Sequence, residues 1–155
     1  MPLGTLASTA FSIAVLETTF EISTIAPSAT ILATIIFPNL FLATNHLSPY
    51  TKKVLRTTLT VPLGYVTSYG EIAKAVGGGP RAVGNIMASN PFPPIVPCHR
   101  VVRANFFLGG YGFGIKTKIE LLRREKQGFS SSREIEVQGG RLTVYPVEQV
   151  LRNFA

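Results

Sequence analysis

Three consecutive glycines followed by a proline, Gly77-Gly78-Gly79-Pro80, divide the middle of the chain into two short helices. Upstream of them, Ser68 and Glu71 have the spacing of a capping box, which predicts a helix that ends near Val76. Glycine is favoured just past the end of a helix, and proline at the first position of the next one. Two short helices joined by a tight glycine turn predict a helix-turn-helix, although many helical hairpins do not bind DNA.

Turn formers and apolar runs elsewhere predict an α+β protein in two parts. Residues 1–47 contain β-branched runs separated by turn formers and are predicted to form a small strand-rich lobe. Residues 48–155 begin with a helix start, Ser48-Pro49, and are predicted to form a mostly helical domain. Within it, Ile95-Val96 predicts a short buried strand leading into Pro97-Cys98-His99-Arg100. The length of 155 residues fits one domain with a small appended lobe.

Three further elements are predicted near the C-terminus. They are a basic amphipathic helix over residues 117–126, a hairpin over residues 135–145 that turns at Gly139-Gly140, and a short helix from residue 147.

The charge of the chain is unevenly distributed. The formal net charge is +7, and all 15 Lys and Arg residues lie after residue 51, whereas the acidic residues before it are Glu17 and Glu21. A basic surface suits a polyanionic partner, because each cation near a phosphate displaces a condensed counterion. Surplus charge can equally serve solubility, so charge alone does not decide between these two interpretations.

A single cysteine, Cys98, excludes an internal disulfide, and no Cys-x-x-Cys spacing indicates a metal or redox site. We expect a reducing compartment, namely the cytoplasm, or the nucleus if the source is a eukaryote. The apolar N-terminal region lacks a basic start, and prolines interrupt its apolar runs. We therefore expect neither a signal peptide nor a membrane anchor, and no metal.

Cys98 is followed directly by His99, a pair that can form an activated nucleophile because a neighbouring base can take the proton of a thiol. On an extended strand these adjacent side chains would point to opposite faces, so contact needs a turn or a bridging water. A lone cysteine is more often a small buried hydrophobe, and a histidine beside it is often only structural.

The surrounding residues resemble the O6-alkylguanine-DNA alkyltransferase family. The resemblance rests on the Asn90-Pro91 to Val102 run with Pro97-Cys98-His99-Arg100-Val101 at its centre, and it spans about residues 48–127. It extends upstream through residues 67–73 and 80–84, and downstream through the Gly110-Tyr111 loop to residues 121–125. The family resemblance implies repair of O6-alkylguanine in double-stranded DNA without a cofactor, and we expect the protein to be a monomer. It implies irreversible alkyl transfer to Cys98, so that each molecule acts once.

The resemblance also implies roles for individual residues. His99 would act as a base toward the thiol through a water, Glu125 would orient His99, and Asn90 would hold the turn that leads to the active-site strand. A buried thiol cannot reach a stacked guanine, so the nucleotide must rotate out of the duplex. The remaining assignments are Arg81 for the vacated stack, Tyr69 for the target phosphate and the flipped base, Tyr111 for a pocket wall, and backbone groups of Cys98, Val101 and Gly112 for the guanine edges. DNA contact is assigned to Arg81, Ala82, Gly84 and Arg100.

Two departures from the family pattern accompany the resemblance. Gly112 stands where many members carry a hydroxyl residue, and residues 1–47 lack the Cys and His ligands of members with a structural zinc. Three alternatives remain open: a catalytically silent relative that recognises damage, a sequence-specific helix-turn-helix regulator, and a Cys-His hydrolase.

Overall fold

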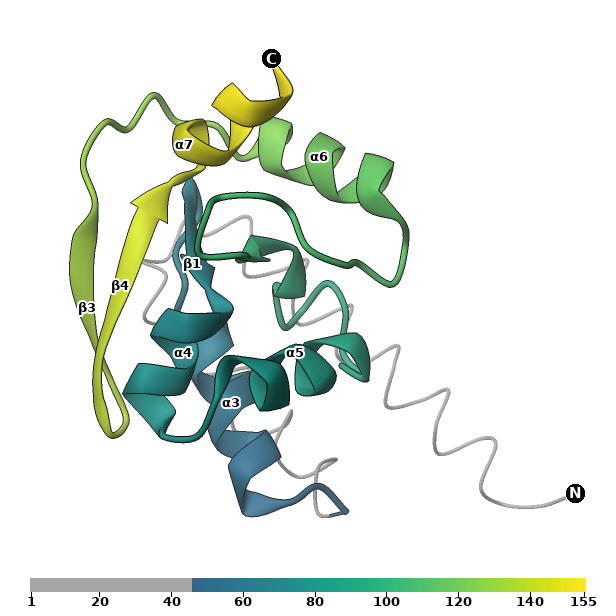
Figure 1. Ribbon diagram of the computed structural model, residues 1–155, viewed down its shortest axis with the longest axis vertical. Coiled ribbons are helices and arrows are strands. Elements are labelled where there is room, and N and C mark those ends of the chain that lie inside the picture. The colour runs from purple at the N-terminus through teal and green to yellow at the C-terminus, as the bar shows by residue number, and fades with distance from the viewer. Residues whose placement is uncertain (1–45) are drawn as a thin grey trace, which may run out of the picture. The chain divides into compact units, whose positions relative to one another are not determined.

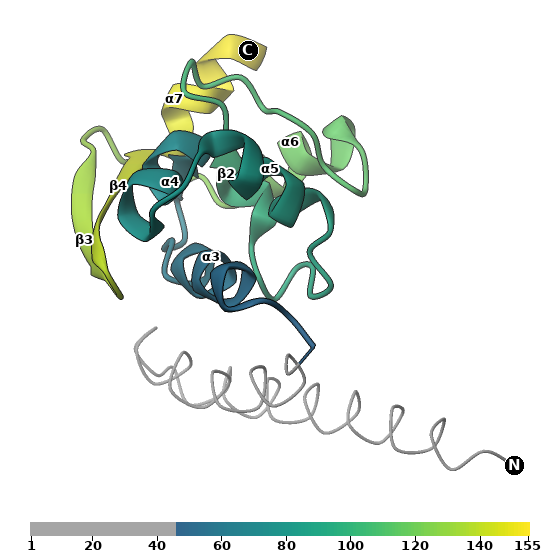
Figure 2. The same cartoon turned by 60° about the horizontal axis from the view of Figure 1, so that its bottom comes forward.

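The helices on either side of the glycine turn begin where the sequence places them in the computed structural model, which describes residues 46–155. Helix α3 (Pro49–Leu59) starts behind Ser48, whose hydroxyl accepts a hydrogen bond of 3.1 Å from the Thr51 N–H. Ser68 caps α4 (Tyr69–Val76) in the same way through the Glu71 N–H. Helix α5 (Pro80–Ala88) follows the glycine turn and packs against α4, while α3 lies against both (Figures 1 and 2). The predicted pair of short helices is confirmed.

A four-stranded sheet with the order β2-β1-β4-β3 lies beside these helices. Strand β1 (Tyr65–Ser68) is buried along its whole length and pairs in parallel with β2 (Val101–Val102). On its other edge β1 pairs antiparallel with β4 (Gly140–Pro146), which forms the predicted hairpin with β3 (Arg133–Val137). The hairpin, on the left of Figure 1, thereby joins the C-terminal region to β1, which pairs with β2 on its other edge.

Two helices and a 3-10 turn complete the described chain. Helix α6 (Ile115–Arg124) begins and ends two residues before the predicted helix, and α7 (Val147–Leu151) runs into the turn η2 (Arg152–Phe154). Their apolar faces share one core with the sheet, and each fully buried aliphatic side chain in such a core contributes about 1.5–3 kcal/mol. The buried members of this core are Val66, Val102, Leu108, Leu122, Val147 and Val150.

The prediction of a strand leading into Cys98 is wrong. Residues 91–96 form turns, and Cys98–Arg100 form a 3-10 turn, η1, so that only Val101–Val102 are extended. Proline has no N–H to donate to a sheet ladder, and four prolines fall between residues 91 and 97. The backbone bonds instead to itself: the Val96 N–H donates to Phe92 O and the Cys98 N–H to Val96 O, both at 2.8 Å.

A strand-rich lobe was expected for residues 1–47, and residues 1–45 of it lie outside the described residues. The lobe and the division at residue 47 stay predictions. None of the helices within residues 46–155 combines the length and apolar character that crossing a membrane requires.

Candidate active site

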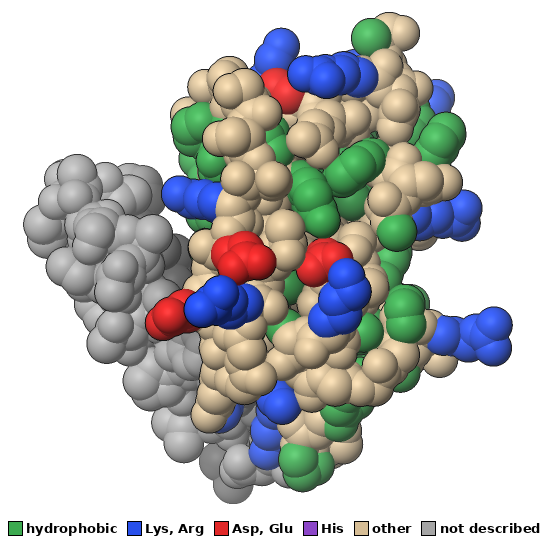
Figure 3. All heavy atoms as spheres, turned by 60° about the vertical axis from the view of Figure 1, so that its left-hand side comes forward, with side chains coloured by type: hydrophobic (Ala, Val, Ile, Leu, Met, Phe, Trp, Pro, Cys, Tyr) green, Lys and Arg blue, Asp and Glu red, His purple; other side chains and the backbone are tan. Residues whose placement is uncertain are grey.

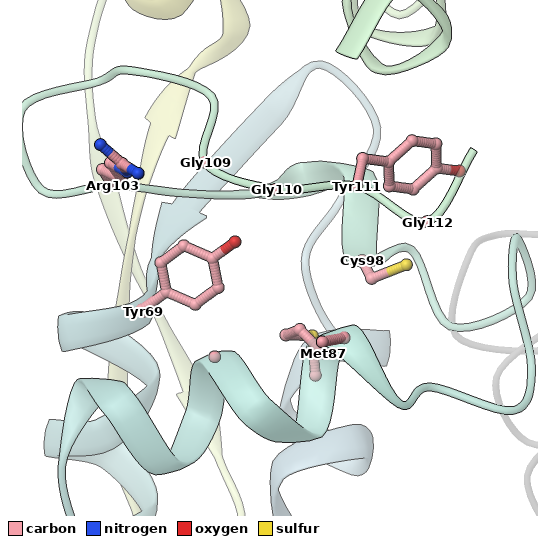
Figure 4. Close-up of a pocket in the computed structure, with 10 residues that line it drawn as sticks. Tyr69, Met87, Cys98, Arg103, Gly109, Gly110, Tyr111 and Gly112 are labelled. Carbon is pink, nitrogen blue, oxygen red and sulfur yellow. The ribbon is translucent and has the colours of Figure 1, made fainter. Parts of the chain in front are cut away.

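Cys98 lines a pocket between α5 and the glycine-rich loop of residues 109–114 (Figure 4). Only 8% of the cysteine is exposed, so the thiol is reached through this pocket. The turn η1 places Cys98 there, because the Arg100 N–H bonds to Pro97 O and the Val101 N–H to Cys98 O. The lining residues are Tyr69, Gly84, Met87, Ala88, Cys98, Arg103, Gly109, Gly110, Tyr111 and Gly112.

His99 is buried next to Cys98 and is held at one ring nitrogen. Its Nε2 lies 2.7 Å from Oε1 of Glu125, the residue that ends α6. A carboxylate can only accept, so Nε2 carries the proton and Nδ1 of the neutral ring has a free lone pair. Nδ1 is buried and has no hydrogen-bond partner among residues 46–155. The turn therefore leaves the basic nitrogen of His99 available for one further hydrogen bond.

Glu125 stays ionised because His99 and Arg100 donate hydrogen bonds to its carboxylate. Burial raises its pKa, but hydrogen bonds from His99 and Arg100 and the charge of Arg100 outweigh burial, and the pKa lies below its ordinary value. An anionic Glu125 fixes the tautomer of His99 and would stabilise the positive charge that His99 gains as a base.

Arg100, which the resemblance assigned to DNA contact, is partly buried and bonds to neighbouring protein groups. Its Nε and one terminal nitrogen each donate to Glu125 at 2.9 Å, and the other terminal nitrogen donates to Val61 O at 2.7 Å. These three bonds use three of the five N–H donors of the guanidinium. The structure thus gives Arg100 a positioning role toward Glu125, and its contact with DNA stays a prediction.

The two tyrosines assigned to the pocket both line it. Burial and the nearby Cys98 raise the pKa of Tyr69, and the charge of Arg103 partly opposes this, so the hydroxyl remains a donor at neutral pH. Gly109 adopts a left-handed φ of 67°, and a Cβ there would lie 2.9 Å from the Tyr69 hydroxyl oxygen, so the loop can approach Tyr69 only as glycine. The Tyr111 ring lies edge-on to His99, with 6.4 Å between the ring centroids.

Asn90 makes two hydrogen bonds that hold the turn before the site. Its Nδ2 donates to Val96 O at 3.1 Å, and its Oδ1 accepts from the Phe92 N–H at 3.0 Å. These bonds close the turn that connects α5 to Cys98. Asn90 contributes to the geometry of the site and does not line the pocket.

The residues assigned to DNA contact on the second helix lie on its outer side. Arg81 and Ala82 are exposed in the first turn of α5, and Gly84 lines the pocket. Because a Cβ on Gly84 would meet no atom within 4 Å, the helix surface beside the pocket is open. The geometry allows α5 to approach a partner closely while the pocket opens next to it.

Lys118 is a buried residue that the sequence reasoning missed. It has no exposed surface, and its Nζ donates to Val101 O at 2.7 Å, to Gly110 O at 3.2 Å and to Leu108 O. Burial lowers its pKa to about 8, although the proximity of Cys98 acts to raise it. The ammonium group ties α6 to both sides of the loop that frames the pocket. Its position four residues before Leu122, on the same helix face, was the signal available in the sequence.

Val101 and Cys98, whose backbone groups the resemblance assigned to the guanine edges, already take part in protein hydrogen bonds. Val101 O accepts from Lys118, and Cys98 O accepts from the Val101 N–H. A carbonyl oxygen has two lone pairs, so each can still accept a bond from a ligand. Within residues 46–155, no three His, Cys, Asp or Glu side chains gather into a set that could hold a metal ion.

Comparison with protein families matches residues 49–127 to the model of "6-O-methylguanine DNA methyltransferase, DNA binding domain". A methylated-DNA--protein-cysteine methyltransferase of Methanocaldococcus vulcanius is 47% identical over 81 residues, which are 52% of this chain and 50% of the relative. The corresponding protein of Pyrobaculum aerophilum is 51% identical over 73 residues, 47% of this chain and 49% of the relative.

Two crystal structures give the same picture. OGT of Mycobacterium tuberculosis in complex with DNA has a TM-score of 0.50 and 46% identity, covering 51% of this chain and 50% of that one. An O6-methylguanine-DNA methyltransferase of the archaeon Pyrococcus kodakaraensis has a TM-score of 0.50 and 43% identity, covering 53% and 48%. This chain thus spans about half the length of the curated relatives and solved structures that it matches.

Proposed function

The chain belongs to the 6-O-methylguanine DNA methyltransferase family, and from this premise we propose that it repairs duplex DNA by moving an alkyl group from O6 of guanine to Sγ of Cys98. One observation carries the proposal. Cys98 opens into a pocket, and the residue after it, His99, is bound through Nε2 to Glu125 while its buried Nδ1 has no partner within the described residues. This arrangement has a nucleophile, a base and a group that orients the base.

The chemical step begins with the thiol. Its proton passes to Nδ1 of His99, bridged by a water, and the thiolate attacks the alkyl carbon opposite O6. A C–S bond forms, the C–O6 bond breaks, and its electron pair stays on guanine, which takes up a proton. The product is a thioether on Cys98 and an unmodified guanine, so the protein is not regenerated. The proton that guanine takes up balances the one that the thiol releases, so the transfer consumes no further reactant.

The remaining pocket residues would bind the rotated guanine. Tyr69 keeps its proton because its pKa is raised by burial and by Cys98, and it can therefore donate a hydrogen bond to the base. Tyr111 would form a wall of the pocket, and backbone groups of Cys98, Val101 and Gly112 would bond to the guanine edges. Gly112 offers its N–H but no side-chain hydroxyl. Arg81 at the exposed start of α5 would fill the vacated stack.

We propose that α5 contacts mainly the sugar-phosphate backbone of the DNA and reads little base sequence, as the family resemblance implies. We also propose that one monomer acts on one lesion. Binding should then vary little between duplex sequences, in contrast to a sequence-specific regulator.

Repair can be tested on the DNA. A duplex with a single O6-methylguanine is incubated with increasing amounts of the protein or of Cys98→Ser, and the remaining lesion is measured after digestion to nucleosides. We expect one lesion removed per wild-type molecule and none by the variant. Tight binding of damaged duplex without lesion loss would instead indicate a silent recognition module. In a separate assay with an ester substrate, repeated turnover would indicate a hydrolase.

A further inference from the structure

Arg103 lies at the rim of the pocket and has no role in the mechanism above. It follows β2 directly and lines the pocket together with Tyr69 and Gly109, on the side away from Cys98 in Figure 4. The residue is exposed, and no Asp or Glu within residues 46–155 forms an ion pair with it. Its five N–H donors are therefore available to a ligand at the pocket mouth.

The backbone that carries Arg103 is held in a tight turn. The Arg103 N–H donates to Phe107 O, and the Phe106 N–H donates to Arg103 O, both at 2.9 Å. Phe106 has a left-handed φ of 62°, its ring lies edge-on to Tyr145, and its carbonyl accepts from Asn153 Nδ2 at 3.2 Å. The turn is thus fastened to β4 and to the C-terminal turn. A cation that starts from a fixed backbone loses less conformational freedom when it binds an anion.

The chemistry of the rotated nucleotide places an anion near this rim. A guanine in the pocket remains joined to the duplex through the phosphates on either side of its sugar. When its O6 substituent reaches Cys98 at the inner end, the sugar and phosphates stay at the mouth. A guanidinium binds a phosphate through two parallel hydrogen bonds, which makes arginine well suited to this position.

We propose that Arg103 binds a phosphate that flanks the rotated guanine nucleotide and so stabilises the nucleotide outside the duplex. The inference rests on the proposed function and adds a DNA-binding residue to it. Arg103 would act on substrate binding and not on the displacement at Cys98. Its charge near Tyr69 fits this placement, since it partly offsets the rise in the Tyr69 pKa.

Two substrates separate phosphate binding from a general effect on the pocket. One is duplex DNA with a single O6-methylguanine, and the other is the free base O6-benzylguanine, which has no phosphate. The rate constant for alkylation of the protein is measured for the wild type, Arg103→Ala and Arg103→Lys. We expect Arg103→Ala to lower the second-order rate with the duplex roughly tenfold and to leave the free-base rate within about twofold. Arg103→Lys should recover part of the loss, because it keeps the charge but not the paired hydrogen bonds.

Arg141 provides the matched control. It lies in β4, pairs with Glu134 at 3.4 Å and does not line the pocket. Acidic and basic side chains are interspersed on the face that carries β3 and β4 (Figure 3), so this face has no continuous basic surface. Arg141→Ala removes the same charge and should leave both rates unchanged.

A neutral methylphosphonate in the duplex identifies the contacted phosphate directly. Placed at the 3′ or the 5′ side of the modified guanine, it should slow the wild type at one of the two positions as much as Arg103→Ala does. It should then have no further effect on Arg103→Ala, because both changes remove the same contact. The salt dependence of duplex binding should also weaken by about one unit of slope in the variant.

Three outcomes would overturn the inference. Equal slowing with duplex and free base would mean that Arg103 shapes the pocket, and an unchanged duplex rate would mean that it makes no phosphate contact. Additive effects of the methylphosphonates and Arg103→Ala would place the contact elsewhere. A wild-type protein that accepts no alkyl group from either substrate would overturn the proposed function itself, and this result differs from all three.

Discussion

At the scale of single residues, the proposed chemistry depends on which nitrogen of His99 is occupied. Glu125 accepts a hydrogen bond from Nε2. Arg100 holds the Glu125 carboxylate in place, and the carbonyl of Val61 holds the Arg100 guanidinium. This chain of contacts runs from α6 to the residue next to the thiol. It sets the tautomer that leaves Nδ1 as the base.

Glu125→Gln should slow alkyl transfer by at least roughly tenfold, because a neutral amide can bond to either form of His99 and does not stabilise its charged state. Binding of damaged duplex should be retained. The measurement is single-turnover kinetics with methylated duplex. Glu120→Gln is the control, since Glu120 is exposed on the same helix and pairs only with Arg124 among the described residues. Equal rates for the two variants would argue against the role of Glu125.

The same variant has a pH signature in stability. The pKa of Glu125 is lower in the folded protein than its ordinary value of 4.5, so the stabilisation is complete above that value and is lost as the pH falls through the folded pKa. The difference in free energy of unfolding between wild type and Glu125→Gln should therefore shrink as the pH falls below 4.5. Urea denaturation at a series of pH values measures this difference, and a difference that grows as the pH falls below 4.5 would have the wrong sign.

Gly112→Ser should raise the rate with O6-methylguanine duplex by roughly threefold to tenfold, because a hydroxyl can stabilise the charge developing on the leaving guanine. A Cβ at Gly112 meets no atom within 4 Å, so the side chain fits without displacement. Gly112→Ala adds the carbon without the donor and serves as the control. If serine and alanine change the rate alike, the pocket does not use a donor at this position.

At the scale of elements, Lys118 determines how the loop around the pocket is held. Its Nζ bonds to carbonyls before and after the turn that contains Arg103, namely those of Val101, Leu108 and Gly110. Lys118→Met leaves these three acceptors without their donor. We expect faster amide hydrogen exchange in residues 103–112 and a lower transfer rate. Lys116→Met, an exposed position on the same helix, should change neither.

Lys118 also makes a prediction about pH. Its pKa is about 8 in the folded protein, against an ordinary value of 10.5. Between these values the unfolded chain holds the proton and the folded chain has released it, so this group adds stability as the pH rises. The free energy of unfolding of wild type relative to Lys118→Met should increase by up to about 3 kcal/mol over this window. A flat or falling difference would contradict the lowered pKa.

The elements that the sequence predicts well are those with local signals. Ser48, Ser68 and Pro80 mark helix starts that depend only on neighbouring residues, and the turn at Gly139 fixes the hairpin in the same way. The turn at Cys98 was predicted as a strand, because apolar Ile95-Val96 outweighed the prolines around it. The partners of Arg100 and Lys118 follow from tertiary contacts with residues 8 to 39 positions away, and pattern reasoning does not reach them.

At the scale of the whole molecule, the described chain combines a helical pair, a sheet, and a pocket between α5 and the glycine-rich loop of residues 109–114. Strand β4 lies beside β1, so the region after residue 127, which the family model does not cover, is part of the sheet that supports the site. The surplus of basic residues after residue 51 falls in the same part of the chain as α5 and the pocket.

The most direct test of alkyl transfer is the mass of the intact protein. Wild type and Cys98→Ala are each incubated with excess duplex that contains O6-methylguanine, and the modified residue is located by fragmentation of the peptides. The wild type should gain the mass of a single methyl group, located on Cys98, and the variant should gain nothing. An unchanged wild-type mass, or a methyl group on any other residue, would contradict the assignment of Cys98 as the acceptor.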